Sequence, residues 1–167
     1  MQMYRYVIKT IPSGRELYVN LISSQAGHYL SRQPYVLGLV KEVTDNLKFE
    51  HKNITAERDM GRIIGNTEII DTTDKDTIYY AKANKKTIFS RFAKNRYPSQ
   101  SSVLTVILER DQEGDYELLD TWIGPHCPPF PGDDHETSTS KLYWETHALV
   151  QDAHPVQSKT ITKVCPY

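Results

Sequence analysis

Apolar and polar residues alternate at the start of the chain and then recur at helical spacing. The runs MYRYVIKTI and RELYVNLIS are rich in β-branched and aromatic residues, and the turn-forming residues PSG separate them, so we predict a β-hairpin. The following run, SRQPYVLGLVKEVTDNL, predicts an amphipathic helix with Ser31 as its cap and Pro34 in its first turn. The apolar face of this helix consists of Val36, Leu39 or Val40, Val43 and Leu47.

The middle of the chain carries two glycines four residues apart. Gly61 and Gly65 lie in ITAERDMGRIIGNTEIIDTTDKD, and such a pair suggests close backbone approach or a phosphate-binding loop. The stretch lacks the GK[ST] ending of a P-loop and the third glycine of a dinucleotide-binding fingerprint. We therefore predict a structural loop or a short helix here.

Strand-like runs dominate the next part of the chain. We predict three strands, at residues 77–83, 102–110 and 115–124. The run VLTVIL is apolar on both faces, as expected of a central strand, and EGDY is a hairpin turn between the last two strands. These strands predict an antiparallel sheet.

A proline-rich stretch and a last helix follow the sheet. GPHCPPFPGDDHETSTS predicts a long loop, and SKTITKV predicts a final polar strand. Between them, TSKLYWETHALV has helical spacing at Leu142, Trp144, Ala148 and Leu149. The order of elements predicts an α+β fold, in which an N-terminal hairpin and helix precede an antiparallel sheet with a C-terminal helix.

Length and composition predict one soluble globular domain. The chain has 167 residues, of which 38% are hydrophobic and 25% are charged, as in ordinary folded proteins. Residues 1–50 are a candidate accessory portion that dimerises, regulates or completes the core. Eleven tyrosines fit either strand-rich packing or a polar working surface.

Targeting signals and cysteine usage predict a cytoplasmic protein. The opening MQMYRYVIKT lacks the apolar run of a signal peptide. No apolar stretch approaches the roughly 18 residues of a membrane span, so we expect no membrane partner. Cys127 and Cys165 are far apart and are expected to be reduced thiols.

Charges are sharply separated in the second half of the chain. The basic block, residues 77–108, contains six cations and no Asp or Glu, whereas residues 109–120 contain six acids and one arginine. The net charge of −1 excludes a generally basic nucleic-acid coat protein. A local anion site remains compatible with it, because the local potential steers ions more than the total charge does.

The basic block mixes cations with aromatic rings. If residues 77–83 and 86–92 form a hairpin, alternation places six side chains on one face: Ile78, Tyr80, Lys82, Thr87, Phe89 and Arg91. If residues 87–94 form a helix instead, Arg91 and Lys94 point outward. Both alternatives predict an exposed Arg91 beside a ring, which suits RNA, with phosphate on the cations and bases on the rings. The other interpretation is a solvated basic face paired with the acidic turn.

Metal-free RNA cleavage also needs an acid or base. His147 is the candidate, in YWETHALV, although a lone histidine there also fits a half-buried structural residue. Thr121 and Trp122 lie at the end of a predicted strand, where site residues often gather. The cluster HCPPFPGDDHE matches no metal motif, so we predict no metal and no other cofactor.

The segment from about residue 59 to 150 resembles an uncharacterised, toxin-like bacterial family. The matching elements are DMGRIIG, DTIYYAK, SRFAKNR, TVIL, LLDTWIGP, PPFPG and YWETHALV. The layout is similar to RelE-like and colicin-like ribonuclease toxins, in which a small sheet holds RNA and catalysis is metal-free. The resemblance implies a toxin-like portion at residues 59–150 and a site of Lys82, Arg91, Lys94, Arg96, Thr121 and His147.

These observations lead to two main predicted functions, beside a third interpretation, a metal-dependent hydrolase that would depend on Asp133 or His135. The first is a metal-independent endoribonuclease of the toxin type, neutralised by an acidic protein. Arg91 and Lys94 would bind phosphate and stabilise the transition state, and His147 would be the acid or base. The other residues would assist catalysis (Lys82), orient the scissile group (Thr121), stack a base (Tyr80 and Phe89) or contact substrate (Arg96 and Trp122). The second is a non-catalytic module that binds RNA or an acidic protein through the same residues.

Overall fold

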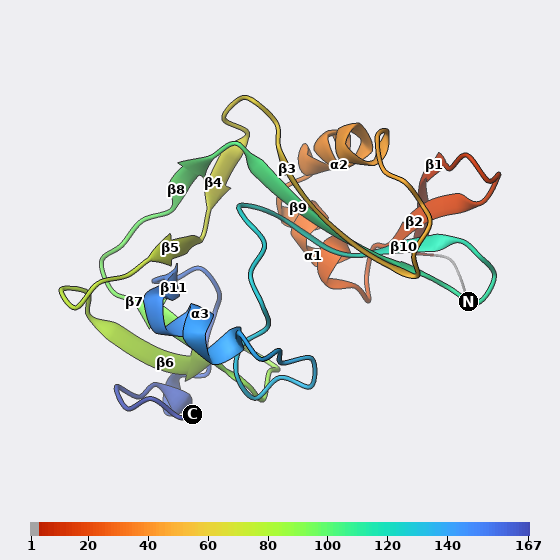
Figure 1. Ribbon diagram of the computed structural model, residues 1–167. Coiled ribbons are helices and arrows are strands. Elements are labelled where there is room, and N and C mark those ends of the chain that lie inside the picture. Colours follow the sequence, from red (N-terminus) through yellow and green to blue (C-terminus); the bar gives the residue numbers. More distant parts are fainter. Residues whose placement is uncertain (1–3) are drawn as a thin grey trace. The chain divides into compact units, whose positions relative to one another are not determined.

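Residues 4–167 of the chain are described by a computed structural model (Figure 1). They contain three α-helices and eleven strands, which confirms the predicted α+β class. The chain divides into two compact units that alternate along the sequence. The first unit comprises the residues up to Ile64 and Ser102–Pro125, and the second comprises Gly65–Ser101 and His126–Tyr167. The predicted toxin-like portion, residues 59–150, therefore contributes to both units.

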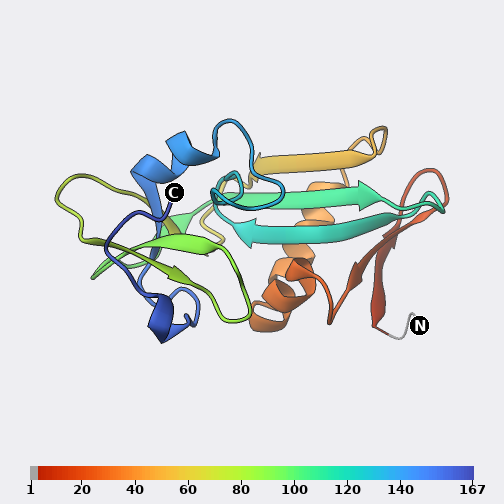
Figure 2. The same ribbon diagram turned by 90° about the horizontal axis from the view of Figure 1, so that it is seen from below.

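The first unit is a five-stranded sheet in the order β1-β2-β10-β9-β3, in which β2 and β10 are parallel and the other neighbours antiparallel. Alternate strand residues such as Leu17, Leu104 and Val106 are buried in one cluster with apolar residues of the two helices. The helices therefore pack on one face of the sheet (Figures 1 and 2). The elements are β1 (Arg5–Thr10), β2 (Glu16–Asn20), α1 (Gln25–Arg32), α2 (Val36–Thr44), β3 (Asn53–Asp59), β9 (Val103–Arg110) and β10 (Tyr116–Ile123).

The predicted hairpin and both predicted strands of this unit are confirmed, but the predicted start of the helix is wrong. Ser31 lies inside α1, and the cap residue of α2 is Tyr35. Ser24 caps α1 by accepting a hydrogen bond from the Gly27 amide at 2.8 Å. The polar sequence QAGHYLSR hides α1 from a search for apolar periodicity.

Glycine spacing was a poor guide to the segment around Gly61. Asn53–Asp59, at its start, is the strand β3, where we predicted a loop or short helix. Residues 60–64 form a turn in which Gly61 has φ +74°, a conformation that glycine adopts without strain. The loop prediction is confirmed for these residues and for residues 72–76, whereas Gly65–Thr67 and Ile69–Asp71 are strands.

The second unit contains a four-stranded sheet in the order β5-β11-β7-β6 and a separate two-stranded ribbon of β4 and β8. Phe92, Leu149 and Tyr79 are buried on one face of the sheet, and Ala93, Ala148 and Ile70 on the other. The elements are β4 (Gly65–Thr67), β5 (Ile69–Asp71), β6 (Ile78–Lys82), β7 (Phe89–Ala93), β8 (Ser99–Ser101), α3 (Ser140–Thr146), β11 (His147–Val150) and the 3-10 helix η1 (Ser158–Thr160).

The predicted last helix is only half right. α3 ends at Thr146, and His147–Val150 forms β11, which pairs with β5 and β7. A short apolar run such as HALV does not distinguish a helix from a buried strand, so the sheet partners decide. The predicted final strand is also wrong, because η1 and an isolated bridge at Thr162 occupy it. The proline-rich stretch is a loop over residues 126–139, as predicted.

Within residues 4–167, no helix is both long enough and apolar enough to cross a lipid bilayer.

Candidate functional site

The β6–β7 hairpin places the predicted basic and aromatic residues on one face. Tyr80 pairs with Arg91, and Lys82 pairs with Phe89, in antiparallel register. The hairpin interpretation of the basic block is therefore confirmed, and the helical one is wrong. We use the name basic strip for the residues of this hairpin that share the face or lie in its turn: Tyr80, Lys82, Lys85, Lys86, Phe89 and Arg91.

The accessible part of the basic strip lies at the hairpin turn. The Lys82 Nζ atom stands 5.0 Å from the centroid of the half-buried Phe89 ring. Lys85 and Lys86 are exposed in the turn, where Lys85 has a left-handed backbone with φ 61°. This end of the strip thus combines three ammonium groups with a partly accessible ring.

Arg91 is buried, contrary to the prediction that it stands exposed. The residue is only 8% exposed. Its Nη1 donates to Thr72 Oγ1 at 2.9 Å and to the His147 carbonyl at 2.8 Å, because β11 lies beside β7 in the sheet. Among the ion pairs of residues 4–167, none includes Arg91. The guanidinium is therefore held by neutral oxygens.

His147 lies at the start of β11 with partners on both ring nitrogens. Nε2 is 2.8 Å from Asp71 Oδ1, and Nδ1 is 2.9 Å from the Tyr143 carbonyl. The imidazole also stacks on the Tyr143 ring, with centroids 3.9 Å apart. His147 is thus a half-buried, well-fixed residue, and its carbonyl joins it to Arg91. Asp71, which the sequence did not single out, completes this pair.

The other cations of the basic block have different surroundings. Lys94 is exposed at the end of β7. Arg96 donates from Nη1 to Asp76 Oδ1 at 2.7 Å. The Thr73 amide and then Arg96 lower the pKa of the Asp76 carboxyl. Arg96 is therefore already neutralised, whereas Lys94 is available to an external anion.

Tyr80 is covered by residues from the last segment of the chain. Its ring meets the ring of Tyr167 edge to face, with centroids 5.8 Å apart. Burial and a hydrogen bond with Cys165 raise the pKa of Tyr80, and contact with Arg91 opposes this. The predicted stacking role of Tyr80 is thus taken by an internal aromatic contact.

Thr121 and Trp122 belong to the first unit, whereas the other seven predicted site residues belong to the second. Thr121 is completely buried, and its Oγ1 donates to the Thr105 carbonyl at 2.8 Å. Trp122 donates from Nε1 to the Pro125 carbonyl at 3.0 Å. These hydrogen bonds lie within the β9–β10 hairpin and in the loop that follows β10. A position at the end of a strand did not distinguish a site residue from a structural one.

Tyr97 is an exposed aromatic residue that sequence reasoning missed. It is 82% exposed, between Arg96 and Pro98 in the loop after β7. It lines a shallow hollow of about 460 Å³ together with Glu68, Asn95, Arg96, Pro98 and the segment 150–153. The signal in the sequence was a tyrosine in the polar run KNRYPSQ, which has no alternation to place it in a core.

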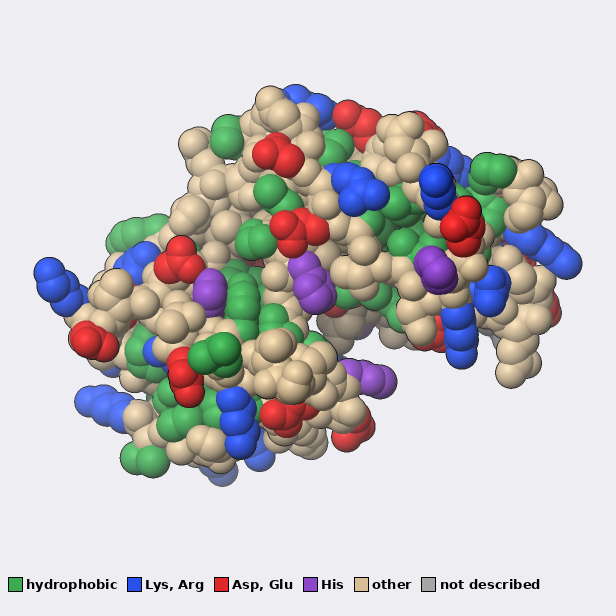
Figure 3. All heavy atoms as spheres, in the orientation of Figure 1, with side chains coloured by type: hydrophobic (Ala, Val, Ile, Leu, Met, Phe, Trp, Pro, Cys, Tyr) green, Lys and Arg blue, Asp and Glu red, His purple; other side chains and the backbone are tan. Residues whose placement is uncertain are grey.

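The surface carries both signs of charge, and no metal centre is formed by the described side chains. On the face drawn in Figure 3, Lys and Arg side chains are interspersed with Asp and Glu. Any anion contact is therefore local. Across residues 4–167, no three His, Cys, Asp or Glu side chains come together to hold a metal ion. The two cysteines, Cys127 and Cys165, are not joined in a disulfide.

Neither family models nor curated proteins nor solved structures give a match to this chain. The toxin-like resemblance therefore stays a prediction.

Proposed function

We propose that the second unit binds single-stranded RNA through the turn end of the basic strip. The observation that carries the proposal is the Lys82 ammonium beside the partly accessible Phe89 ring, next to the exposed Lys85 and Lys86. This arrangement offers a cation for a phosphate and a flat face for a base within one hairpin.

Phosphate contacts and stacking supply the affinity in different ways. Each phosphate that an ammonium neutralises releases counterions and adds about 0.7 to the salt slope for a single strand. A base stacked on an aromatic ring contributes about 1–3 kcal/mol, independent of sequence. Exposed Lys94 and Tyr97 offer the same two chemistries after β7. Binding is therefore expected to be salt-sensitive and to tolerate many sequences.

Fluorescence anisotropy with a fluorescein-labelled oligouridylate tests this function. We expect Lys82→Gln to weaken binding severalfold and to lower the salt slope, because one phosphate contact is lost. Phe89→Leu should weaken binding at every salt concentration, because stacking is lost. Lys141→Gln is the matched control, since Lys141 is an exposed lysine of the same unit, on α3.

Two results would contradict RNA binding. One is an anisotropy that does not change at low salt. The other is an equal loss in Lys82→Gln and Lys141→Gln, which would indicate general charge attraction. Competition by polyglutamate as effective as by unlabelled oligouridylate would instead indicate a surface for an acidic protein.

A second candidate, a metal-independent endoribonuclease, is favoured by the His147–Asp71 pair. The Tyr143 carbonyl accepts from Nδ1 and orients the imidazole so that Nε2, which faces Asp71, is the nitrogen for proton transfer, and Arg91 donates to the carbonyl of the same histidine. His147 would take the proton of the 2′-hydroxyl as that oxygen attacks the phosphate, or supply one to the leaving 5′-oxygen. For this step Nε2 must release its contact with Asp71 and contact the substrate instead. Such a toxin would be neutralised by an acidic protein that covers the basic strip.

Cleavage of total cellular RNA in excess EDTA separates the two functions. Discrete fragments from the parent and from Lys141→Gln, and none from His147→Ala, would support the nuclease. Intact RNA with every variant, together with binding in the anisotropy assay, would leave the non-catalytic module.

A further inference from the structure

The segment 155–162 runs along the outer edge of β6 and completes its hydrogen bonding. Tyr80 and Thr162 exchange backbone hydrogen bonds at 2.7 and 2.9 Å, and the Lys82 amide donates to Thr160 Oγ1 at 2.9 Å. Gln157 also donates from its side chain to the carbonyls of Ala83 and Lys86. This segment is therefore firmly attached to the hairpin that carries the basic strip.

The next residues cross from this edge onto the face of the strip. Lys163, Val164, Cys165 and Pro166 are exposed, with Val164 at 74%. Tyr167 then packs on Tyr80, and the residue as a whole remains 36% exposed. Burial raises the pKa of Tyr167, as do Tyr80 and Cys165, while Arg91 acts in the opposite direction. The ring thus covers the Tyr80–Arg91 end of the strip from an exposed linker.

Tyr80 and Arg91 are the next cross-strand pair after Lys82 and Phe89 on the same face. Two residues along a strand span about 6.8 Å, so a chain that stacks on Phe89 reaches this pair with its neighbouring nucleotide. The pair offers a ring and a guanidinium that has only neutral hydrogen-bond partners. It is chemically equivalent to the turn end of the strip but is occupied by Tyr167.

We infer that Tyr167 is an internal ligand of the RNA site, whose ring takes the place of one base beside Tyr80 and Arg91. RNA that binds along the whole strip displaces residues 163–167, while the bonds of residues 155–162 keep the segment attached. The inference rests on the proposed function and adds its regulation. An occupant that leaves the site open one-tenth of the time lowers the apparent affinity about tenfold.

The test measures binding of the labelled oligouridylate to the full chain, to three substituted variants and to one shortened chain. We expect Tyr167→Ala to bind about tenfold more tightly, because the competing ring is gone. Val164→Ala is the matched control, since this exposed side chain lies on the same linker. In Tyr167→Ala/Arg91→Gln the gain should disappear. A chain that ends after Thr162 lacks Tyr167 and keeps Arg91, so it should reproduce the gain. It tests the inference even if the Arg91 variant folds poorly.

Each outcome is decisive for the inference. Equal affinities of the parent, Tyr167→Ala and the shortened chain would overturn it and leave the proposed function standing. Binding by Tyr167→Ala but not by the parent would support it and show a site that is closed in the parent. Binding by none of the proteins would overturn the proposed function and, with it, the inference. A gain that persists without the Arg91 guanidinium would overturn the assigned position of the base.

Discussion

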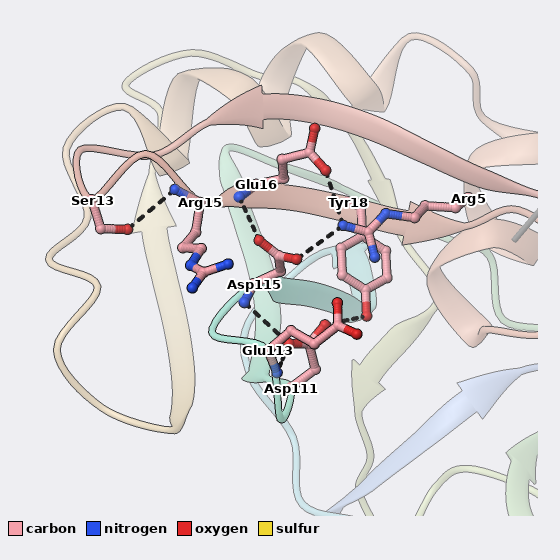
Figure 4. Close-up of polar contacts among 8 residues, drawn as sticks. All are labelled: Arg5, Ser13, Arg15, Glu16, Tyr18, Asp111, Glu113 and Asp115. Carbon is pink, nitrogen blue, oxygen red and sulfur yellow. Dashed lines mark hydrogen bonds and ion pairs between the residues drawn. The ribbon is translucent and has the colours of Figure 1, made fainter.

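Each unit holds a largely buried arginine beside a tyrosine, but the two arginines have different partners. In the first unit, Arg5 lies 3.7 Å from the centroid of the Tyr18 ring (Figure 4). Its Nη2 donates to Glu16 at 3.0 Å and to Asp115 at 3.2 Å. In the second unit, Arg91 is bonded to Thr72 Oγ1 and to a backbone carbonyl. The partners of the first cation are carboxylates, whereas the hydrogen-bond partners of the second are neutral oxygens.

Tyr18, beside Arg5, also has a carboxylate partner, because its hydroxyl donates to Asp111 at 3.0 Å. Burial and the hydrogen bond to Asp111 raise the pKa of Tyr18 to about 12, against the opposing effect of Arg5. The acidic turn that follows the basic block thus belongs to the Arg5 cluster, through Asp111 and Asp115 (Figure 4). Burial alone does not distinguish a structural arginine from a ligand-binding one. Arg5 has carboxylates as hydrogen-bond partners and Arg91 has none, and for this reason we propose an anion site in the second unit only.

The largest expected effect is a difference between the same substitution at the two arginines. Arg5→Met leaves Asp115 and Glu16 without their cation, and loss of hydrogen bonds between charged, partly exposed groups costs about 2 kcal/mol. Arg91→Met leaves only neutral acceptors and should cost about 1 kcal/mol. The free energies of unfolding from urea titrations measure the difference.

The fluorescence of the two tryptophans allows the unfolding of each unit to be measured separately. We call these two unfolding curves the Trp122 transition and the Trp144 transition. Trp122 lies in the first unit and Trp144 in the second, and the chain has two tryptophans in all. Arg5→Met is therefore measured in a Trp144→Phe protein, where Trp122 alone reports the first unit. Arg91→Met is measured in a Trp122→Phe protein, where Trp144 alone reports the second. Each is compared with the same tryptophan variant that keeps its arginine. Equal losses at both positions would show that the partners of the two arginines do not differ in energy.

Sequence patterns predicted the hairpins of both units, because each hairpin is a local feature. The alternation in RYVIKT and ELYVN and the turn between them suffice for β1 and β2. A local sequence pattern does not show which distant segments pair in a sheet. His147–Val150 is a strand because it lies between β5 and β7, although its sequence fits a helix equally well. For the same reason the sequence did not predict the interleaving of the two units.

The sequence predicted which residues of the candidate site share a face of the sheet, but it did not predict how exposed they are. Period-two alternation correctly placed Lys82, Phe89 and Arg91 together. Burial of Arg91 depends on Thr72 and on the carbonyl of His147, 56 residues away along the chain. Covering of Tyr80 depends on Tyr167. Such contacts arise from tertiary packing, so no spacing within the basic block could reveal them.

A fall in pH should destabilise the first unit through Asp115. The Glu16 amide and then Arg5 hold the pKa of the Asp115 carboxyl below its usual range. The stability that this provides is complete above the ordinary aspartate pKa and is lost as the pH falls through the lowered one. Asp115→Asn should therefore flatten the acid dependence of the Trp122 transition and leave that of Trp144 unchanged. Equal flattening of both transitions would contradict this assignment.

Glu117 should show a smaller effect of opposite sign. Burial raises its pKa, and the neighbouring Glu109 and Asp111 raise it further. The charged form is therefore disfavoured in the folded unit, and its destabilising effect grows as the pH rises through the raised pKa. We expect Glu117→Gln to stabilise the first unit by about 0.5 kcal/mol at neutral pH. No gain at neutral pH, measured by the Trp122 transition, would show that the charge is well solvated.

The smallest effect is expected from the second cation–ring contact, between Lys82 and Phe89. At 5.0 Å from the centroid and in reach of solvent, this contact contributes about 0.5 kcal/mol, less than the closer contact of Arg5 with Tyr18. Lys82→Met should therefore hardly change the Trp144 transition while it weakens RNA binding severalfold. Lys141→Met is the control for a loss of charge alone. If Lys82→Met destabilised the second unit as much as Arg5→Met destabilises the first, Lys82 would be a structural residue like Arg5, and the proposed RNA site would keep only Lys85 and Lys86 as accessible cations.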